Sequence, residues 1–163
     1  MPVYTHRSLM PATPGQLFHF HENPHNLRLL PTVGLQVVEI EAEQIAAAGG
    51  KFAVAIRQGP FTLRWTGRWE RVEYPNLLVD VGIRCPFAYW RHEHWFEAAA
   101  EGATLTDRIE FRLPWRRGGP AGDWVAQRII LPGMFAARHE ATRRLLAAPE
   151  PPGKNPLARK PNP

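Results

Sequence analysis

Hydrophobic and polar residues alternate with period two through the middle of the chain, from Val33 to Leu113. This alternation is typical of strands with one buried face. Gly, Pro and Asn clusters divide the segment into six strands, and one further run, Val3 to Met10, precedes them. The six are Leu35 to Glu43, Lys51 to Gln58, Thr62 to Val72, Leu77 to Cys85, Tyr89 to Ala98 and Thr104 to Leu113. Because the separators are short, neighbouring strands are expected to pair antiparallel.

Helical patterns lie on either side of the strands. Thr13-Pro14 predicts an N-cap and a first helical position, so short helices are expected over Gln16 to His21 and over Pro24 to Leu30. A long helix is expected over Asp123 to Ala147, with a kink or local break at Pro132-Gly133. Its predicted apolar stripe consists of Val125, Ile129, Met134, Phe135 and Leu145.

These elements predict an α+β helix-grip fold, in which a curved seven-stranded antiparallel sheet surrounds a long C-terminal helix and two short helices follow the first strand. Where such a sheet curls further than the helix can fill, a cavity opens between them. The domain is expected over residues 1–148. Residues 149–163 are rich in proline and are expected to form a disordered tail.

The composition fits one soluble globular domain, with 163 residues, 44% hydrophobic residues and a mean hydropathy of −0.33. No apolar run is long enough to span a bilayer, so membrane insertion is not expected. The first residues lack the apolar segment of a secretory signal. Cys85 is the only cysteine, which excludes an internal disulfide and favours a cytoplasmic protein.

The formal net charge of +5 does not indicate a nucleic-acid partner. Lys154, Arg159 and Lys160 lie in the predicted tail, and elsewhere arginines alternate with acids, as in Arg68-Trp69-Glu70-Arg71. Solvated strand faces have this pattern, whereas a nucleic-acid site needs a concentrated basic stripe.

The candidate chemistry centres on the predicted strand that contains His92 and His94. Period two places both histidines on one face with Trp90 and Phe96. Buried histidines are costly unless they are hydrogen-bonded, bind a metal or line a wet cavity. Hairpin pairing is expected to bring Asp80, Gly82 and Arg84 opposite His94, His92 and Trp90, and Asp107 and Ile109 near Phe96 and His94. The predicted inward cluster is Asp80, Arg84, His92, His94 and Asp107, ringed by Trp65, Trp69 and Trp90.

Four interpretations of this cluster remain open. The first is a polar network whose members hydrogen-bond one another, and the second is a ligand site in an apolar cavity. The third is an acid–base pair of His92 or His94 with Asp107 or Asp80, and the fourth is a metal site. For a metal, His92 and His94 would need Asp107 or His21 as a third ligand, a weakly specific pattern, so no metal or cofactor is assigned. His19, His21 and His25 are expected to cap and solvate helix ends.

The order of elements and several motifs resemble the Bet v 1/START-like superfamily, also called SRPBCC ligand-binding domains. Within it, the chain is similar to a polyketide-cyclase-like bacterial group also found fused to domains that resemble nucleoside-diphosphate-sugar epimerases. The motifs are Phe18 to Pro24, Leu27 to Pro31, Trp65, Trp69, Val79-Asp80, Pro86 to Phe96, Thr106 to Pro114 and Phe135 to His139. The resemblance implies a fold for hydrophobic ligands, whose members include carriers, cyclases, hydrolases and partner-binding modules.

We therefore predict that the domain binds a small hydrophobic or amphipathic molecule between the sheet and the C-terminal helix. Besides the cluster and its tryptophans, the predicted site includes Phe111, Met134, Phe135 and Arg138. One alternative is an enzyme of cyclase, dehydratase or hydrolase type that uses His92, His94 and Asp107. Another is a module that docks an unknown protein partner by a sheet edge or the short helices.

Overall fold

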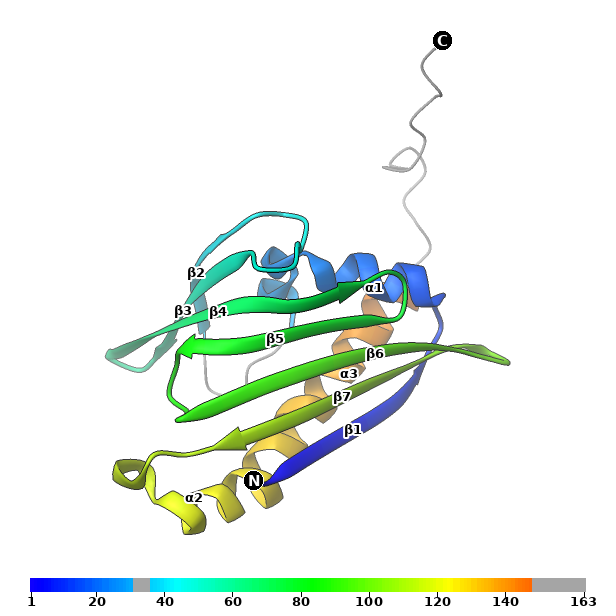
Figure 1. Cartoon of the computed structure of the whole chain (residues 1–163). Coiled ribbons are helices and arrows are strands. Elements are labelled where there is room, and N and C mark those ends of the chain that lie inside the picture. Colours follow the sequence, from blue (N-terminus) through cyan, green and yellow to red (C-terminus); the bar gives the residue numbers. More distant parts are fainter. Residues whose placement is uncertain (31–35, 148–163) are drawn as a thin grey trace.

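The computed structural model describes residues 1–30 and 36–147. Seven strands form one antiparallel sheet in the order β1-β7-β6-β5-β4-β3-β2, so β1 lies beside the last strand of the chain (Figure 1). The strands are β1 (Val3–Met10), β2 (Gln36–Ala42), β3 (Lys51–Gln58), β4 (Phe61–Glu73), β5 (Leu77–Arg84), β6 (Tyr89–Ala99) and β7 (Gly102–Arg112). The predicted sheet is confirmed, with described strand ends within two residues. Leu35, the predicted start of the second strand, and the predicted tail, 149–163, lie outside the described residues.

Two short helices follow β1, as the sequence predicted: α1 (Pro14–Glu22) and the 3-10 helix η1 (Pro24–Leu29). A capping box begins α1, because the Thr13 hydroxyl accepts the Gln16 N–H at 3.2 Å and the Gln16 side chain accepts the Thr13 N–H at 2.8 Å. Asn23 ends α1, and its side chain accepts a backbone N–H of η1 at 3.0 Å. The two helices are therefore joined without a loop.

The C-terminal helix begins at Gly119, four residues before the predicted start. Gly118 and Gly119 have φ of 98° and 49°, a conformation that glycine adopts readily and that turns the chain directly into the helix. The segments are η2 (Trp115–Arg117), α2 (Gly119–Val125), the π-helical turn η3 (Ala126–Ile130) and α3 (Leu131–Ala147). None of the helices in the described residues is long and apolar enough to cross a membrane.

The π-helical turn η3 is the local break expected near Pro132. Proline has no N–H to donate, and its ring clashes with the carbonyl four residues earlier, here Arg128, so the preceding turn widens. Buried residues are five apart across η3 and three or four apart beyond it: Ala126, Leu131, Phe135, His139 and Thr142. The predicted stripe is therefore wrong at Val125, Ile129 and Leu145, which are exposed.

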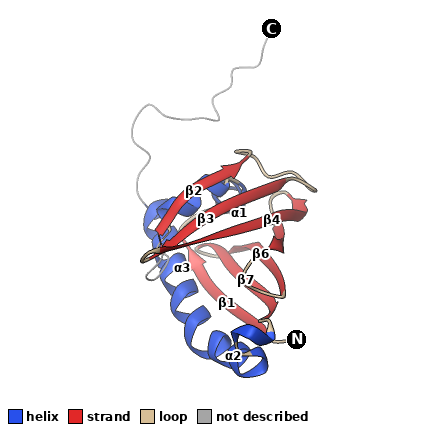
Figure 2. Ribbon diagram, turned by 90° about the vertical axis from the view of Figure 1, so that its left-hand side faces the viewer, coloured by secondary structure: helices blue, strands red, loops and turns tan. Residues whose placement is uncertain are grey.

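Helix α3 packs along the sheet, mainly against β1 (Figure 2). Two apolar clusters fill the interior. The α1 cluster consists of Met10, Ala12, Leu17, Phe18, Ala46, Trp69, Leu78, Phe96, Ala103 and Leu105. The α3 cluster consists of Trp90, Ile109, Phe111, Ala126, Leu131 and Phe135, with the partly buried Tyr4, Trp65, Cys85, Phe87, Leu113 and Met134 against it. The space between these clusters holds the polar side chains described below.

Gly67 on β4 allows one close contact in this packing. A Cβ atom at Gly67 would lie 2.5 Å from the ring of Phe52. We predict that Gly67→Ala lowers the free energy of unfolding by ~1–3 kcal/mol through overpacking, as measured in urea. Gly133→Ala is the control, because a Cβ there meets nothing within 4 Å and a helical Gly→Ala change should stabilise by ~0.5–1 kcal/mol. Unchanged stability of Gly67→Ala would contradict the prediction.

Candidate functional site

A layer of polar side chains crosses the interior between the two apolar clusters. On β6, His92 and His94 separate Trp90 of the α3 cluster from Phe96 of the α1 cluster, and Asp107 takes the same place on β7. We define the polar layer as Asp80 from β5, His92 and His94 from β6, Asp107 from β7 and His139 from α3. Three neighbouring strands and the long helix therefore meet at this layer.

Strand pairing places Asp80 opposite His92 and His94 opposite Asp107. The predicted register was wrong by two residues in both hairpins, since Asp80 was expected opposite His94 and Asp107 near Phe96. A shift of two residues keeps every side chain on its face. The predicted inward orientation of the four strand residues, Asp80, His92, His94 and Asp107, is therefore confirmed.

Asp107 is the shared acceptor of the layer. It accepts His92 Nε2 at 3.2 Å and His139 Nε2 at 2.7 Å. His94 Nδ1 lies 2.6 Å from the same carboxylate, although its geometry makes this contact an ion pair rather than a hydrogen bond. Burial favours the neutral acid, but the charge of His94 and the hydrogen bonds from His139 and His92 hold the pKa of Asp107 well below its usual range.

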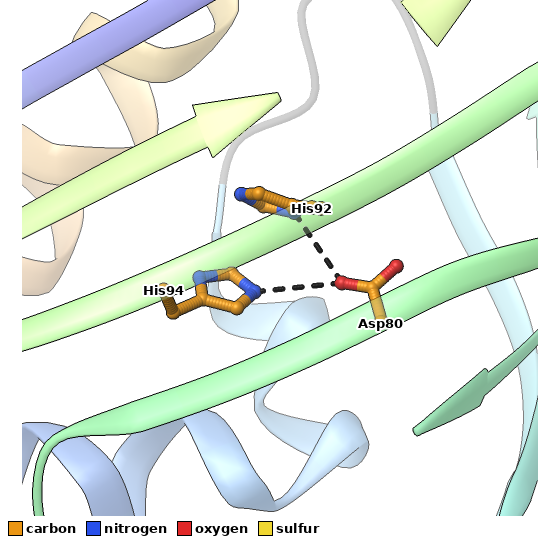
Figure 3. Close-up of side chains that lie close together, drawn as sticks. All are labelled: Asp80, His92 and His94. Carbon is orange, nitrogen blue, oxygen red and sulfur yellow. Dashed lines mark ion pairs between the residues drawn. The ribbon is translucent and has the colours of Figure 1, made fainter. Parts of the chain in front are cut away.

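Asp80 lies on the other side of the two histidines (Figure 3). Its Oδ2 is 3.4 Å from His92 Nδ1 and 3.6 Å from His94 Nε2, and its Oδ1 accepts Trp90 Nε1 at 3.3 Å. Burial opposes ionisation, but the imidazoles of His92 and His94 that face this carboxylate outweigh it and keep the pKa of Asp80 below its usual range. Both carboxylates are therefore ionised at neutral pH.

His94 carries a compensating positive charge. Burial lowers its pKa, yet the charges and hydrogen-bonding groups of Asp107 and Asp80 raise it to about 9. Both ring nitrogens of His92 and of His94 face carboxylates. A general base needs a nitrogen within reach of the substrate. Here all four nitrogens are occupied by carboxylates. The contacts therefore favour a binding or structural role for His92 and His94 over acid–base catalysis.

Three polar side-chain atoms in and beside the layer are buried without a hydrogen-bond partner among the described residues. They are Nδ1 of His94, which makes the ion pair with Asp107, Nδ1 of His139 and Nε of Arg138. The Arg138 guanidinium lies over the ring of Phe135, 5.7 Å from its centroid. Burial lowers the pKa of Arg138, whereas Asp107 and Asp80 raise it. Arg138 is thus a cation beside the layer with an unused donor.

His139 was missed by the sequence prediction, although it lies four residues after the buried Phe135 and so on the same helical face. His21 was expected to cap and solvate a helix end. It lies in the last turn of α1, but its ring is directed into the interior rather than into solvent. Its Nδ1 donates to the Leu17 carbonyl at 2.7 Å, and its ring lies 5.3 Å from that of His94. Burial and the charge of His94 lower the pKa of His21 to about 3.

The predicted aromatic ring is divided between the two apolar clusters. Trp65 packs on Trp90 with ring centroids 4.9 Å apart, whereas Trp69 belongs to the α1 cluster and packs on Phe52 at 5.3 Å. Phe111, Met134 and Phe135 join the α3 cluster, as a site between sheet and helix requires. Arg84 was expected in the inward cluster, which is wrong, because it is exposed where β5 ends.

Two hollows among the described residues open widely to the outside. One is lined by Leu29 and α3 residues from Ala137 to Leu145, and the other by residues of β2, β3 and β4, including Phe52 and Arg64. No residue of the predicted site lines either hollow. Neither of these two hollows therefore lies at the predicted place between the sheet and α3.

Exposed apolar side chains lie just before and within the first part of the C-terminal helix. Trp115, Trp124, Ile129 and Ile130 are exposed on η2, α2 and η3. The partner-docking hypothesis named the sheet edges and the two short helices, so this apolar surface lies elsewhere.

The raised pKa of His94 predicts a stability loss in alkali. A histidine that titrates near pH 6.5 when unfolded and near pH 9 when folded stabilises fully below pH 6.5 and progressively less up to pH 9. We expect the free energy of unfolding, measured in urea with a chelator present, to fall by on the order of 3 kcal/mol over this range. His94→Gln should remove this fall, whereas His19→Gln, an exposed control on α1, should retain it. An equal fall in both variants would contradict the prediction.

The contacts of Asp107 predict that it matters more for stability than Asp80. Asp107→Asn removes the charge that faces three histidines at 2.6–3.2 Å, so we expect a loss of ~3–5 kcal/mol in urea unfolding. Asp80→Asn should cost less, because its histidine contacts are longer, at 3.4 and 3.6 Å. A larger loss of stability in Asp80→Asn than in Asp107→Asn would contradict the prediction.

The sequence matches no family model, and no curated protein matches it. Solved structures are similar to the chain. A structural-genomics protein of Rhodobacter sphaeroides is 20% identical with a TM-score of 0.73, over 91% of this chain and 95% of that protein.

Two other similar structures have descriptive names. Norcoclaurine synthase of Thalictrum flavum, solved as a point mutant in complex with a transition-state analogue, is 16% identical with a TM-score of 0.65, over 89% of this chain and 93% of that one. The di-domain ARO/CYC StfQ from the steffimycin biosynthetic pathway is 11% identical with a TM-score of 0.71, over 88% of this chain and 50% of that one. At these identities the likeness shows the fold. The chain has the helix-grip fold of Bet v 1-like and polyketide-cyclase-like proteins, as its resemblance to SRPBCC domains predicted.

Proposed function

We propose that this domain binds a small, largely apolar molecule that carries an anionic or hydrogen-bond-accepting group, between the inner face of the sheet and α3. One observation carries the proposal. An aromatic cluster lies beside Arg138, whose buried Nε has no partner among the described residues. Small-molecule sites combine an apolar wall with a few convergent polar groups in this way.

The aromatic wall comes from three strands and one turn. Phe87 lies 4.8 Å from Trp90 and 5.9 Å from Phe111 between ring centroids, and Trp65 packs edge-on against Trp90. Trp65 and Phe87 are only partly buried, and Met134 covers the wall from α3. These partly buried side chains offer contact area to a flat apolar molecule.

Binding requires the partly buried side chains to move apart, since neither hollow described above opens onto this aromatic wall. Rotamer changes of this kind are common on binding. The fold of norcoclaurine synthase, solved with a transition-state analogue, supports a small-molecule role for the similar framework of this chain. Arg138 would then donate to the ligand's acceptor group, and the positive charge of His94 would favour an anion nearby.

We test this proposal with 1-anilinonaphthalene-8-sulfonate, an apolar anion, after native mass spectrometry of the fresh protein has shown any molecule that copurifies. The dye should bind, become fluorescent and quench tryptophan emission. Arg138→Met should weaken binding ~10-fold through loss of one charge-assisted hydrogen bond. Arg144→Met, an exposed control on the same helix that loses a contact with Glu140, should bind as the wild type does. Absence of both dye binding and copurifying molecules, or equal affinity of all three proteins, would refute the proposal.

A further inference from the structure

We propose that Asp80, His92 and His94 bind a divalent transition-metal ion of the zinc type. Each of these residues offers one ligand atom, and the three atoms lie within 4.8 Å of one another. Figure 3 shows both rings directed at the same carboxylate from β6, with Asp80 on the neighbouring strand. This inference does not depend on the apolar ligand proposed above.

The spacing of these atoms suits an ion better than hydrogen bonds. Asp80 Oδ2 is 3.4 Å from His92 Nδ1 and 3.6 Å from His94 Nε2. Good N–H···O bonds are ~2.7–3.2 Å long. Two ligand atoms that each lie ~2.0–2.1 Å from a tetrahedral zinc ion are separated by about 3.3–3.4 Å. Small side-chain shifts would therefore bring all three atoms into coordination distance.

The outer contacts have the arrangement that orients metal ligands. Ligating histidines commonly donate their second ring nitrogen to a carboxylate. Here the second nitrogens, His92 Nε2 and His94 Nδ1, both lie against Asp107, at 3.2 and 2.6 Å. The second oxygen of Asp80 accepts Trp90 Nε1 at 3.3 Å. Each proposed ligand is thus held by a partner on the side away from the ion.

Charge and ligand type specify the class of metal. Asp80 and Asp107 place two negative charges in a buried layer. A dication held by neutral histidines would balance them in place of the positive charge on His94. Two imidazoles and one carboxylate suit zinc, cobalt or ferrous iron, whereas magnesium and calcium prefer all-oxygen sites. Three protein ligands leave at least one coordination position for water or a small molecule.

Chelator-treated protein is titrated with zinc by calorimetry and with cobalt by visible absorption. We expect one ion per chain with a Kd of ~1 µM or tighter, a raised Tm, and the intense visible bands of a low-symmetry cobalt site. Asp80→Asn should weaken binding by ~100-fold or more. Trp90→Phe, which keeps the ring but loses the N–H to Asp80, should weaken it ~10-fold, as outer-shell changes do.

His19→Gln is the matched control, because His19 lies 2.6 Å from Glu22 on the exposed side of α1 and could hold a metal at the surface. This variant should bind zinc as the wild type does. The wild-type titration decides without any variant: a Kd weaker than ~100 µM, or no defined stoichiometry, overturns the proposal. Equal affinity in Asp80→Asn, or loss of binding in His19→Gln, also overturns it.

Discussion

The structure depends on the sharing of one buried carboxylate, that of Asp107, by three histidines. Two of them come from the neighbouring strand β6, and His139 comes from the C-terminal helix. Desolvation of a charge inside a protein costs several kcal/mol, so such a group is stable only when its partners are in place. The carboxylate therefore fixes where α3 lies on the sheet as well as how β6 and β7 pair.

The polar layer also explains why the interior consists of two apolar clusters rather than one. Hydrophobic burial is not directional, and two smooth apolar surfaces tolerate sliding past each other. A row of paired polar groups between the clusters allows one alignment only, because a slip would separate Asp107 from His139 or Asp80 from His92. The groups that specify the fold here are the same groups that are available to bind an ion or face a ligand.

The sequence was sufficient to predict the strands, the inward face of Asp80, His92, His94 and Asp107, and the superfamily resemblance. Period two reveals which face a residue occupies, but it carries no information on register, so Asp80 was expected opposite His94 rather than His92. His139 could not be paired with Asp107 from sequence, because no local pattern states which strand a helix will contact. The apolar stripe failed at Ile129 because a constant helical period does not allow for a π-helical turn. The presence of a hollow between sheet and helix depends on side-chain packing, which element order does not determine.

The π-helical turn η3 has a consequence for how the helix meets the sheet. It adds one residue to the winding, and one residue of an α-helix corresponds to a rotation of about 100°. If the same helix were wound without interruption from Gly119, α3 would be turned by that angle relative to the part before η3. Ala126 and Leu131, which are five residues apart, could not then both face the sheet. Pro132, a residue that usually disrupts helices, thus sets the rotational phase that directs an imidazole from the last helix onto a carboxylate of the last strand.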